Sequence, residues 1–311
     1  MFLIPPLPQD SLIAVVAPAG PAQPDALARL PDLYARFGFR VRIYPGCHAT
    51  CAGELGGGAD YLAGDDATRL ADLHAALAAP DVAAIHCMRG GYGAMRLLPE
   101  IDTALVRSAR KLLIGYSDIT ALHALWCREG LVSLHAPMPT SDHLKAGREA
   151  DTEALFKLLQ QGHAAGSTWQ PALLPGPSLR IAGSATGRLV GGNLSLVAAL
   201  LGTPFAWPAH GSILFLEDIN EDAHRVDRLL TQLRLAGVLD AVAGFVLGSF
   251  TEGDRPLGPL QQMLAPLGKP TLGGWPAGHG TPNLPLPLGA QVRLEVSADI
   301  AQSSSLSWLD S

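Results

Sequence analysis

The segment Lys111-Leu-Leu-Ile-Gly-Tyr-Ser-Asp-Ile-Thr120 decides the fold class, because it combines a buried strand with a sharp turn and the start of a helix. Leu112–Ile114 is an apolar run of strand length, and Gly115 ends it. Ser117 and Asp118 are residue types that cap helices, and helical composition follows them. A serine here is either a helix N-cap or a nucleophile at a strand's carboxyl end, where free helix N–H groups can stabilise an oxyanion.

Strands and helices alternate along the first half of the chain. Apolar runs predict buried strands in residues 11–17, 82–87 and 112–114, and alternation predicts another strand in residues 40–44. Apolar residues at helical spacing predict helices over residues 25–37, 65–79 and 97–109. Buried strands that alternate with helices indicate a parallel sheet covered on both faces, which places this half in the α/β class.

Three loops are expected at the carboxyl edge of this sheet, where sites form in α/β folds. They are Pro18–Pro21, Arg89–Gly93 and Gly115–Asp118. The second loop, Arg89-Gly-Gly-Tyr-Gly93, is not a dinucleotide fingerprint, because G-x-G-x-x-G is absent. Its glycines fit either a loop whose backbone N–H groups approach a ligand, as in an oxyanion hole, or a tight turn that needs positive φ.

The composition changes after Thr140. Residues 162–178 are rich in Gly, Pro and Ser, which predicts a linker between an N-terminal domain (1–161) and a C-terminal domain (179–311). We expect the second domain to be β-rich, of α+β or barrel-like type, with less helix than the first. Asn193 follows a glycine turn and is predicted either to cap the next helix or to face the cleft between the domains.

Composition limits the classes of function. The chain has 311 residues, 48% of them hydrophobic, and a formal charge of −6 without blocks of like charge, which argues against nucleic-acid and anionic-membrane binding. Cys47 and Cys51 lack a second pair for a zinc site, and we expect neither a metal nor a cofactor. The N-terminus lacks the basic and apolar regions of a secretory signal, which predicts a cytoplasmic protein with reduced thiols.

A serine nucleophile needs a general base and an acid that orients the base. Among the ten histidines, His279 differs because it lies between two glycines, although a structural role is the alternative. The acid could be Glu217, Asp218 or Glu221, near the end of an expected strand. Neighbouring strand residues point to opposite faces, so only one of Glu217 and Asp218 can face the site, and the spacing does not decide which.

Short segments across nearly the whole chain carry a family resemblance. They are Val16–Gly20, Met88–Gly93, Ile114–Thr120, Gly191–Leu194, Leu214–Asp218 with Arg225 and Asp227, and Gly278–Gly280 ahead of Leu284–Gly289. Together and in this order they resemble the LD-carboxypeptidase family of serine peptidases, which includes muramoyltetrapeptide carboxypeptidases and microcin C self-immunity peptidases. Ile119 stands where the G-x-S-x-G elbow of α/β-hydrolases has its second glycine, which argues against an ordinary esterase.

The resemblance implies roles for particular residues. Ser117 matches the family's nucleophile, Glu217 the orienting acid and His279 the general base. The family's oxyanion hole consists of backbone N–H groups, which map onto Gly91 and Asp118. These roles come from the resemblance, whereas the residue types alone leave the choice of acid open.

The resemblance also implies a fold and a reaction. The family joins a flavodoxin- or amidotransferase-like parallel α/β N-terminal domain to a β-rich C-terminal domain, with the site between them, and its members are often homodimers. The implied reaction releases terminal D-alanine from the L-centre of diaminopimelate in murein tetrapeptides, during cell-wall recycling. Arg89, Gly90 and Asn193 are expected to contact the substrate, with Arg89 either a cation for its carboxylate or a structural residue.

Two other functions stay open at this point. An immunity-type peptidase would cleave aminoacyl-nucleotide antibiotics of the microcin C kind and would need an aromatic loop to stack the nucleobase. Trp169 and Trp207 are the candidates, although both lie in Pro-flanked segments that fit packing equally well. The non-enzymatic alternative is a two-domain binder of small molecules, which would not need Ser117, Glu217 and His279 within hydrogen-bond reach.

Overall fold

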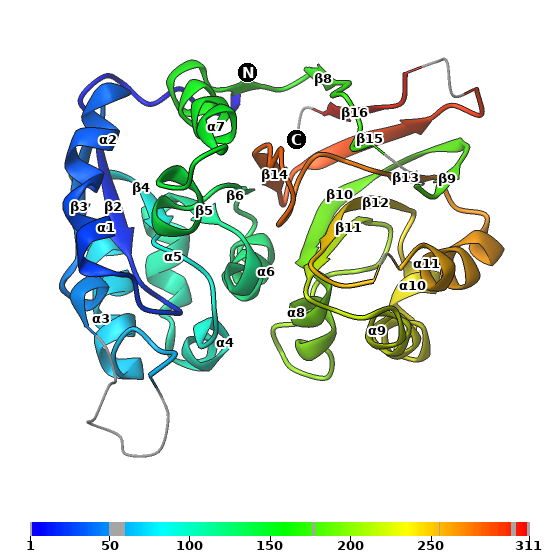
Figure 1. Ribbon diagram of the computed structural model, residues 1–311, viewed down its shortest axis with the longest axis horizontal. Helices are drawn as coiled ribbons and strands as arrows, with labels where there is room; N and C mark the ends of the chain where they lie inside the picture. The colour runs from blue at the N-terminus through cyan, green and yellow to red at the C-terminus, as the bar shows by residue number, and fades with distance from the viewer. Residues whose placement is uncertain (1, 50–59, 176–177, 255, 300–302, 310–311) are drawn as a thin grey trace.

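Each half of the chain is built on its own β-sheet, and the two sheets lie side by side (Figure 1). The computed structural model describes residues 2–49, 60–175, 178–254, 256–299 and 303–309. The expected α/β architecture, with a parallel N-terminal sheet and a β-rich C-terminal half, is confirmed.

The N-terminal sheet has six strands in the order β14-β6-β5-β4-β2-β3. Their bounds are β2 (Leu12–Val16), β3 (Arg40–Ile43), β4 (Val82–Cys87), β5 (Leu112–Gly115), β6 (Ser133–His135) and β14 (Leu286–Leu288). Strands β2 to β6 are parallel to one another, and β14 is antiparallel to β6. The carboxyl ends of the parallel strands therefore meet at one edge, as the alternating pattern predicts.

Helices cover this sheet. They are α1 (Pro24–Ala28), α2 (Leu30–Arg36), α3 (Asp66–Ala78), α4 (Ala94–Leu97), α5 (Thr103–Ala109), α6 (Thr120–Arg128) and α7 (Glu149–Gln161), with short turns η1 (Pro45–His48), η2 (Leu98–Glu100), η3 (Ser117–Ile119) and η4 (Pro139–His143). The single helix expected over 25–37 is divided at Arg29, because Pro31 fits only the first turn of a new helix.

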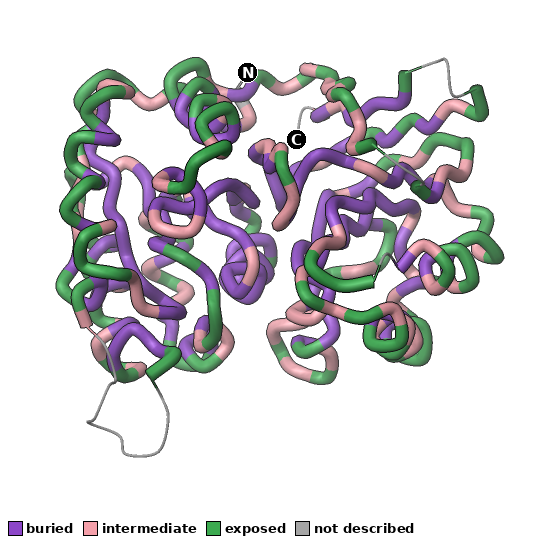
Figure 2. Tube along the Cα trace, viewed as in Figure 1, coloured by how far each residue is buried: buried purple, intermediate pink, exposed green. Residues whose placement is uncertain are grey.

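Helix α6 lies between the two halves. Residues 120–127 are all buried, and Figure 2 shows this helix in purple beside the C-terminal sheet. A helix that is buried all round must be covered on every side, and the C-terminal half supplies the second cover. At the contact, a Cβ on Gly192 would lie 2.5 Å from Thr120 Oγ1, so a glycine there allows the close approach.

The C-terminal sheet has eight strands in the order β8-β16-β15-β10-β11-β12-β13-β9. Their bounds are β8 (Thr168–Trp169), β9 (Arg180–Ile181), β10 (Gly183–Asn193), β11 (Ile213–Ile219), β12 (Gly244–Thr251), β13 (Thr271–Gly273), β15 (Gln291–Val296) and β16 (Ser305–Trp308). Strands β10 to β13 are parallel, and their neighbours are antiparallel. The helices of this half are α8 (Leu194–Ala199), α9 (Ala223–Leu235), α10 (Val238–Ala241) and α11 (Leu257–Leu264), followed by η5 (Ala265–Leu267).

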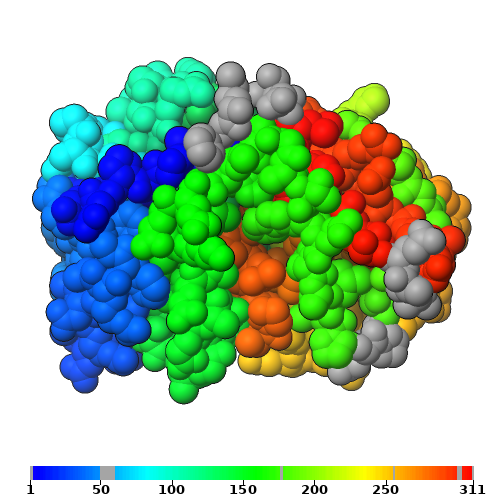
Figure 3. All heavy atoms as spheres, turned by 90° about the horizontal axis from the view of Figure 1, so that it is seen from above, coloured from blue at the N-terminus to red at the C-terminus, as the bar shows by residue number. Residues whose placement is uncertain are grey.

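The two halves exchange short pieces of chain. After α7, strand β7 (His163–Ala164) pairs with β1 (Phe2–Ile4), and β8 then joins the C-terminal sheet. Figure 3 shows this green part of the chain crossing the top of the molecule. In the other direction, β14 returns to the N-terminal sheet. The predicted boundaries at residues 161 and 179 stay a prediction.

Two further findings concern the described part of the chain. Cys47, Cys87 and Cys127 are buried free thiols, whereas Cys51 lies outside the described residues. None of the helices described has both the length and the apolar character that a membrane crossing requires.

Candidate active site

The turn after β5 holds Ser117 in an unusual backbone conformation. Its φ is +63°, a left-handed value that a non-glycine residue adopts only where the surroundings impose it. The interpretation of Ser117 as a helix N-cap is wrong. Ser117 is the first residue of η3, which has no side-chain cap, and the N-cap position of α6 is Ile119. A strained strand-to-helix turn that leaves the serine hydroxyl free is the geometry of a nucleophile elbow.

A glycine loop packs directly on this serine. A Cβ on Gly90 would lie 2.8 Å from Ser117 Cβ and 2.9 Å from Ser117 Oγ, so only a glycine fits. The next residue, Gly91, has a φ of +117°, and among the described residues its N–H donates to no acceptor. Both alternatives for this loop therefore apply, because positive φ and a bare backbone beside the serine occur together.

Asp118 contributes its backbone and its side chain in different directions. Its N–H lies in the first turn of η3, 3.3 Å from the position of a Cβ on Gly90. Its carboxylate accepts a hydrogen bond from Ala94 N at 2.8 Å, at the start of α4. Burial raises the pKa of this carboxyl to about 6, although Ala94 and Arg69 oppose the shift. The side chain thus ties the serine turn to α4.

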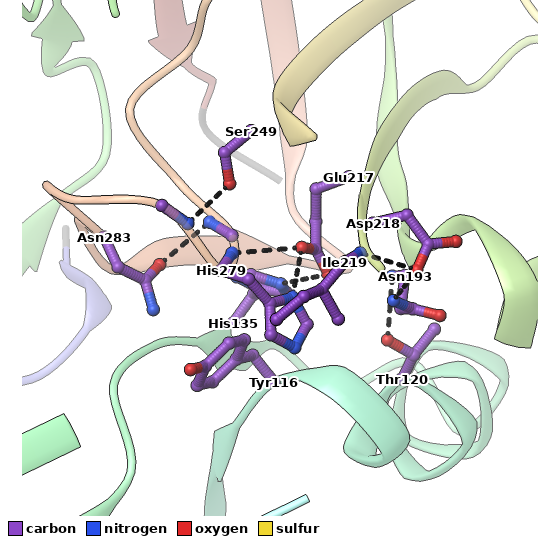
Figure 4. Close-up of polar contacts among 12 residues, drawn as sticks. Tyr116, Thr120, His135, Asn193, Glu217, Asp218, Ile219, Ser249, His279 and Asn283 are labelled. Atoms are coloured by element: carbon purple, nitrogen blue, oxygen red, sulfur yellow. Dashed lines mark hydrogen bonds and ion pairs between the residues drawn. The ribbon is translucent and has the colours of Figure 1, made fainter. Parts of the chain in front are cut away.

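The C-terminal half contributes a hydrogen-bonded pair of acid and base (Figure 4). His279 Nδ1 lies 2.7 Å from Glu217 Oε2, and the backbone N–H of His279 donates to the same oxygen at 3.2 Å. Burial by itself would raise the pKa of Glu217, but His279 and the other contacts lower it to about 2. Burial likewise opposes the charged imidazole, yet Glu217 raises the pKa of His279 above its ordinary value.

A local irregularity of the sheet presents Glu217 to the histidine loop. The register between β11 and β12 shifts between Leu216 and Asp218, as in a β-bulge that re-aims a side chain. The loop approaches closely because Gly278 has a φ of +113° and no Cβ, which would lie 2.7 Å from Glu217 Oε2. Ser249 Oγ then accepts a hydrogen bond from Gly280 N at 2.8 Å.

The structure resolves the choice between the two neighbouring acids. Figure 4 shows Glu217 directed to His279 and Asp218 directed to Asn193. Asp218 accepts hydrogen bonds from Asn193 Nδ2 at 2.7 Å and from both the N–H and the hydroxyl of Ser195 at 2.9 Å. The third candidate, Glu221, lies 3.8 Å from Arg225. Among these three acids, Glu217 is the one that contacts His279.

Tyr116 and Arg148 bring the two halves of the site together. The rings of Tyr116 and His279 are 4.8 Å apart, so the residue before Ser117 lies against the imidazole. Arg148 donates to the backbone oxygens of His279, at 2.9 Å, and of Gly280. In the part of the chain that the structure describes, Ser117 Oγ makes no hydrogen bond, so its approach to the imidazole is a prediction.

The residues expected around a substrate come from both sheets, since Arg89 and Gly90 follow β4 and Asn193 ends β10. Arg89 is exposed and donates to Pro21 O at 3.1 Å. Asn193 is buried and caps α8 by accepting from Leu196 N at 3.2 Å, as the N-cap alternative predicts. A contact of Arg89, Gly90 or Asn193 with substrate stays a prediction.

Several residues of the site were not singled out from the sequence. They include Tyr116, His135, Asp142, Arg148, Ser249 and Asn283. Tyr116 donates to Asp142 Oδ1 at 3.0 Å, and Asn283 Oδ1 accepts from Gly278 N at 3.0 Å. The position of Tyr116 beside Ser117 was the one available hint, whereas the others reach the site through tertiary packing.

The two tryptophans proposed for nucleobase stacking are buried to different degrees. Trp169 packs against His163 and Trp308, with ring centroids 5.1 Å and 4.8 Å away. Trp207 is 9% exposed. Packing is therefore the interpretation that the structure supports for Trp207, whereas Trp169 is half-buried and lines a cavity together with Pro171 and Leu284.

Two family models match the chain. The LD-carboxypeptidase N-terminal domain matches residues 13–136, and the LD-carboxypeptidase C-terminal domain matches residues 186–294. The probable murein peptide carboxypeptidase of Bacillus subtilis is 34% identical over 95% of this chain and 92% of its own length. The murein tetrapeptide carboxypeptidase of Pseudomonas aeruginosa is 34% identical over 93% of this chain and 94% of its own length.

A solved structure gives the same picture. The crystal structure of muramoyltetrapeptide carboxypeptidase from Oxalobacter formigenes matches with a TM-score of 0.79 and 30% identity. The match covers 96% of this chain and 99% of that one. Both halves of the fold and their arrangement are therefore similar to those of the Oxalobacter formigenes protein.

Proposed function

Because the chain belongs to the LD-carboxypeptidase family, we propose that it is a serine peptidase that releases terminal D-alanine from murein tetrapeptides. The observation that carries the proposal is the Glu217–His279 pair, 2.7 Å between oxygen and nitrogen, whose imidazole lies against Tyr116, the residue before the strained Ser117. A binding protein would have no need of a nucleophile turn opposite a charge-stabilised imidazole. The two-domain binder is for this reason the weaker alternative.

The proposed mechanism is acyl transfer. His279 removes the proton from Ser117 Oγ while the oxygen attacks the carbonyl carbon of the scissile bond. The backbone N–H groups of Gly91 and Asp118 stabilise the resulting oxyanion. His279 then protonates the leaving amine of D-alanine, which leaves an acyl-enzyme on Ser117. Water, deprotonated by His279, attacks the acyl group and restores the serine.

The electrostatics of the pair suit this role. Glu217 stays ionised at neutral pH because its pKa is lowered to about 2. Its Oε2 accepts from Nδ1 of His279, so Nε2 is left to exchange the proton with Ser117. The raised pKa of His279 reflects the same attraction, which stabilises the imidazolium that forms during attack.

The substrate proposal follows the relatives. Two relatives that are 34% identical are named as a probable murein peptide carboxypeptidase and a murein tetrapeptide carboxypeptidase. The ring contact of Trp169 with Trp308 and the burial of Trp207 make both tryptophans weaker candidates for nucleobase stacking, which disfavours the aminoacyl-nucleotide alternative. We further propose that the protein works in the cytoplasm. We also propose that it is a homodimer, which sedimentation of the purified protein would test.

One experiment separates the functions. The purified protein is incubated in parallel with monomeric murein tetrapeptide and with an aminoacyl sulfamoyl adenylate, and the products are identified by mass spectrometry. We expect tripeptide and free D-alanine from the first and intact material from the second. Cleavage of the adenylate alone would replace the proposal by the immunity-type peptidase, and binding without cleavage of either would favour the binder.

A further inference from the structure

A second buried imidazole faces the acid of the candidate site. His135, the last residue of β6, is 0% exposed, and its Nε2 lies 3.7 Å from Glu217 Oε1. Within the described residues, neither ring nitrogen of His135 has a hydrogen-bond partner, and Glu217 Oε1 has none either. Figure 4 shows His135 and Tyr116 beside the Glu217–His279 pair.

Unpaired polar atoms in a protein interior are costly, so this group requires an explanation. Glu217 Oε2 already accepts from Nδ1 and the backbone N–H of His279, which leaves Oε1 as a free charged acceptor. Shortening the 3.7 Å separation by about 0.8 Å gives an ordinary N–H···O distance of about 2.9 Å. His135 belongs to the N-terminal sheet and Glu217 to the C-terminal sheet, so such a bond would join the two halves.

A neighbouring histidine shows what a purely structural role requires. His123 is also fully buried, but its Nδ1 lies 2.8 Å from Ser133 Oγ and its Nε2 2.8 Å from Gly115 O. Both of its nitrogens are paired inside the N-terminal half. His135 differs because the carboxylate oxygen 3.7 Å from its Nε2 belongs to Glu217, in the other half of the molecule.

The place of His135 in the sheet gives this contact its consequence. His135 is the register partner of Gly115, two residues before Ser117. A bond from His135 to Glu217 therefore fixes the distance between the sheet that carries the nucleophile and the carboxylate that holds the base. Besides Glu217, the His135 ring has the titratable groups Tyr116 and His123 near it, with ring centroids 5.5 Å and 6.5 Å away. The ring centroid of Phe215 is 5.1 Å from that of His135.

We propose that His135 is a positioning residue of the acyl-transfer centre: its Nε2–H donates to Glu217 Oε1 and couples the acid–base pair to the sheet that carries Ser117. This inference rests on the proposed function for its catalytic consequence, while the bond itself is independent of the substrate. His135 touches no reacting atom in this scheme and acts through Glu217.

The decisive measurement is the titration of the His279 ring, followed by NMR in protein labelled with ¹⁵N-histidine. His135→Phe removes the donor, and the charge of Glu217 is then shared with His279 alone. We expect the His279 midpoint to rise by about half a pH unit or more. Either protonation state of His135 predicts this sign, because loss of a donor or of a positive charge favours the imidazolium. His135→Gln keeps an N–H donor and is expected to stay close to the wild type.

The control replaces a buried histidine elsewhere. His163 packs on Trp169 and Trp308 and bonds with Ser167, so His163→Phe tests the effect of losing a buried imidazole in general. It is expected to leave the His279 midpoint unchanged. A midpoint that stays or falls in His135→Phe, or moves equally in His163→Phe, overturns the proposal. Should His135→Phe fail to fold, His135→Met, which also lacks a donor, takes its place under the same criteria.

Kinetics on tetrapeptide supply the second readout. Loss of a hydrogen bond to a charged group predicts a fall in kcat of about 10- to 100-fold in His135→Phe, with KM nearly unchanged and partial recovery in His135→Gln. A kcat equal to that of wild type would contradict the catalytic consequence. If the wild type itself releases no D-alanine, the proposed function fails, whereas the NMR titration still decides on His135.

Discussion

The serine side and the acid–base side of the site are positioned by different forces. Ser117 is held by its backbone, with a φ of +63° and the bare Gly90 packed on its Cβ. Glu217 and His279 are held by hydrogen bonds and by opposite charge, and their mutual attraction shifts both pKa values against the effect of burial. Steric changes should therefore damage the first side, and changes of charge the second.

The largest effect is expected from Ser117→Ala. Without the hydroxyl no acyl-enzyme can form, and turnover should fall by about 10⁶-fold, to the residual rate that binding and the oxyanion hole supply. The measurement is D-alanine release, with the unfolding midpoint as the check that the turn persists. Turnover near that of wild type would remove Ser117 from the mechanism.

The next effect separates two adjacent acids. Glu217→Gln deprives His279 of its ionised partner and favours the wrong tautomer, so kcat should fall by about 10⁴-fold. Asp218→Asn changes a carboxylate of the same strand that contacts Asn193 and Ser195, and its loss of kcat should stay within about tenfold. Steady-state kinetics of the two variants give the order, and the reverse order would mean that the wrong acid has been assigned.

A steric change should affect the serine side without altering any charge. In Gly90→Ala the new methyl carbon would meet Ser117 Cβ at 2.8 Å, and displacement of the nucleophile should lower kcat by about 10²-fold. Gly258→Ala is the matched control, because a Cβ there meets nothing within 4 Å. Equal kinetics for the two variants would show that the close packing of Gly90 does not position the serine.

The smallest effect concerns the pH profile. His279 must be neutral to accept the proton, and Glu217 raises its pKa, so kcat/KM should fall with decreasing pH around a midpoint above 6.5. In Glu217→Gln the attraction is lost, burial dominates, and the midpoint should move down. Asp218→Asn should move it less, since Glu217 is the larger influence on His279. A midpoint that does not respond to Glu217→Gln would exclude the pair as its origin.

Local sequence was sufficient for the strand, turn and helix around Ser117, although it left the role of the serine open between an N-cap and a nucleophile. The apolar run before Gly115, the turn and the following helix are contiguous, and backbone preferences act over such short distances. The parallel sheet followed in the same way from buried strands that alternate with helices. The split at Pro31 was equally local and could have been predicted from the proline itself.

The acid–base side depended on tertiary structure. Alternation showed that Glu217 and Asp218 face opposite ways, but the bulge at that strand end and the approach of Gly278 determined which of them contacts His279. The residue types alone left this choice open, and the family resemblance named Glu217.

The sequence by itself determined the strand–turn–helix that carries Ser117, the α/β class and the family resemblance, because each depends on neighbouring residues or on short motifs. Only the tertiary structure decided that β14 completes the N-terminal sheet, that Arg148 holds the His279 loop and that His135 faces Glu217. Those contacts join residues far apart in the chain, and their geometry follows from how two separately built sheets pack against each other.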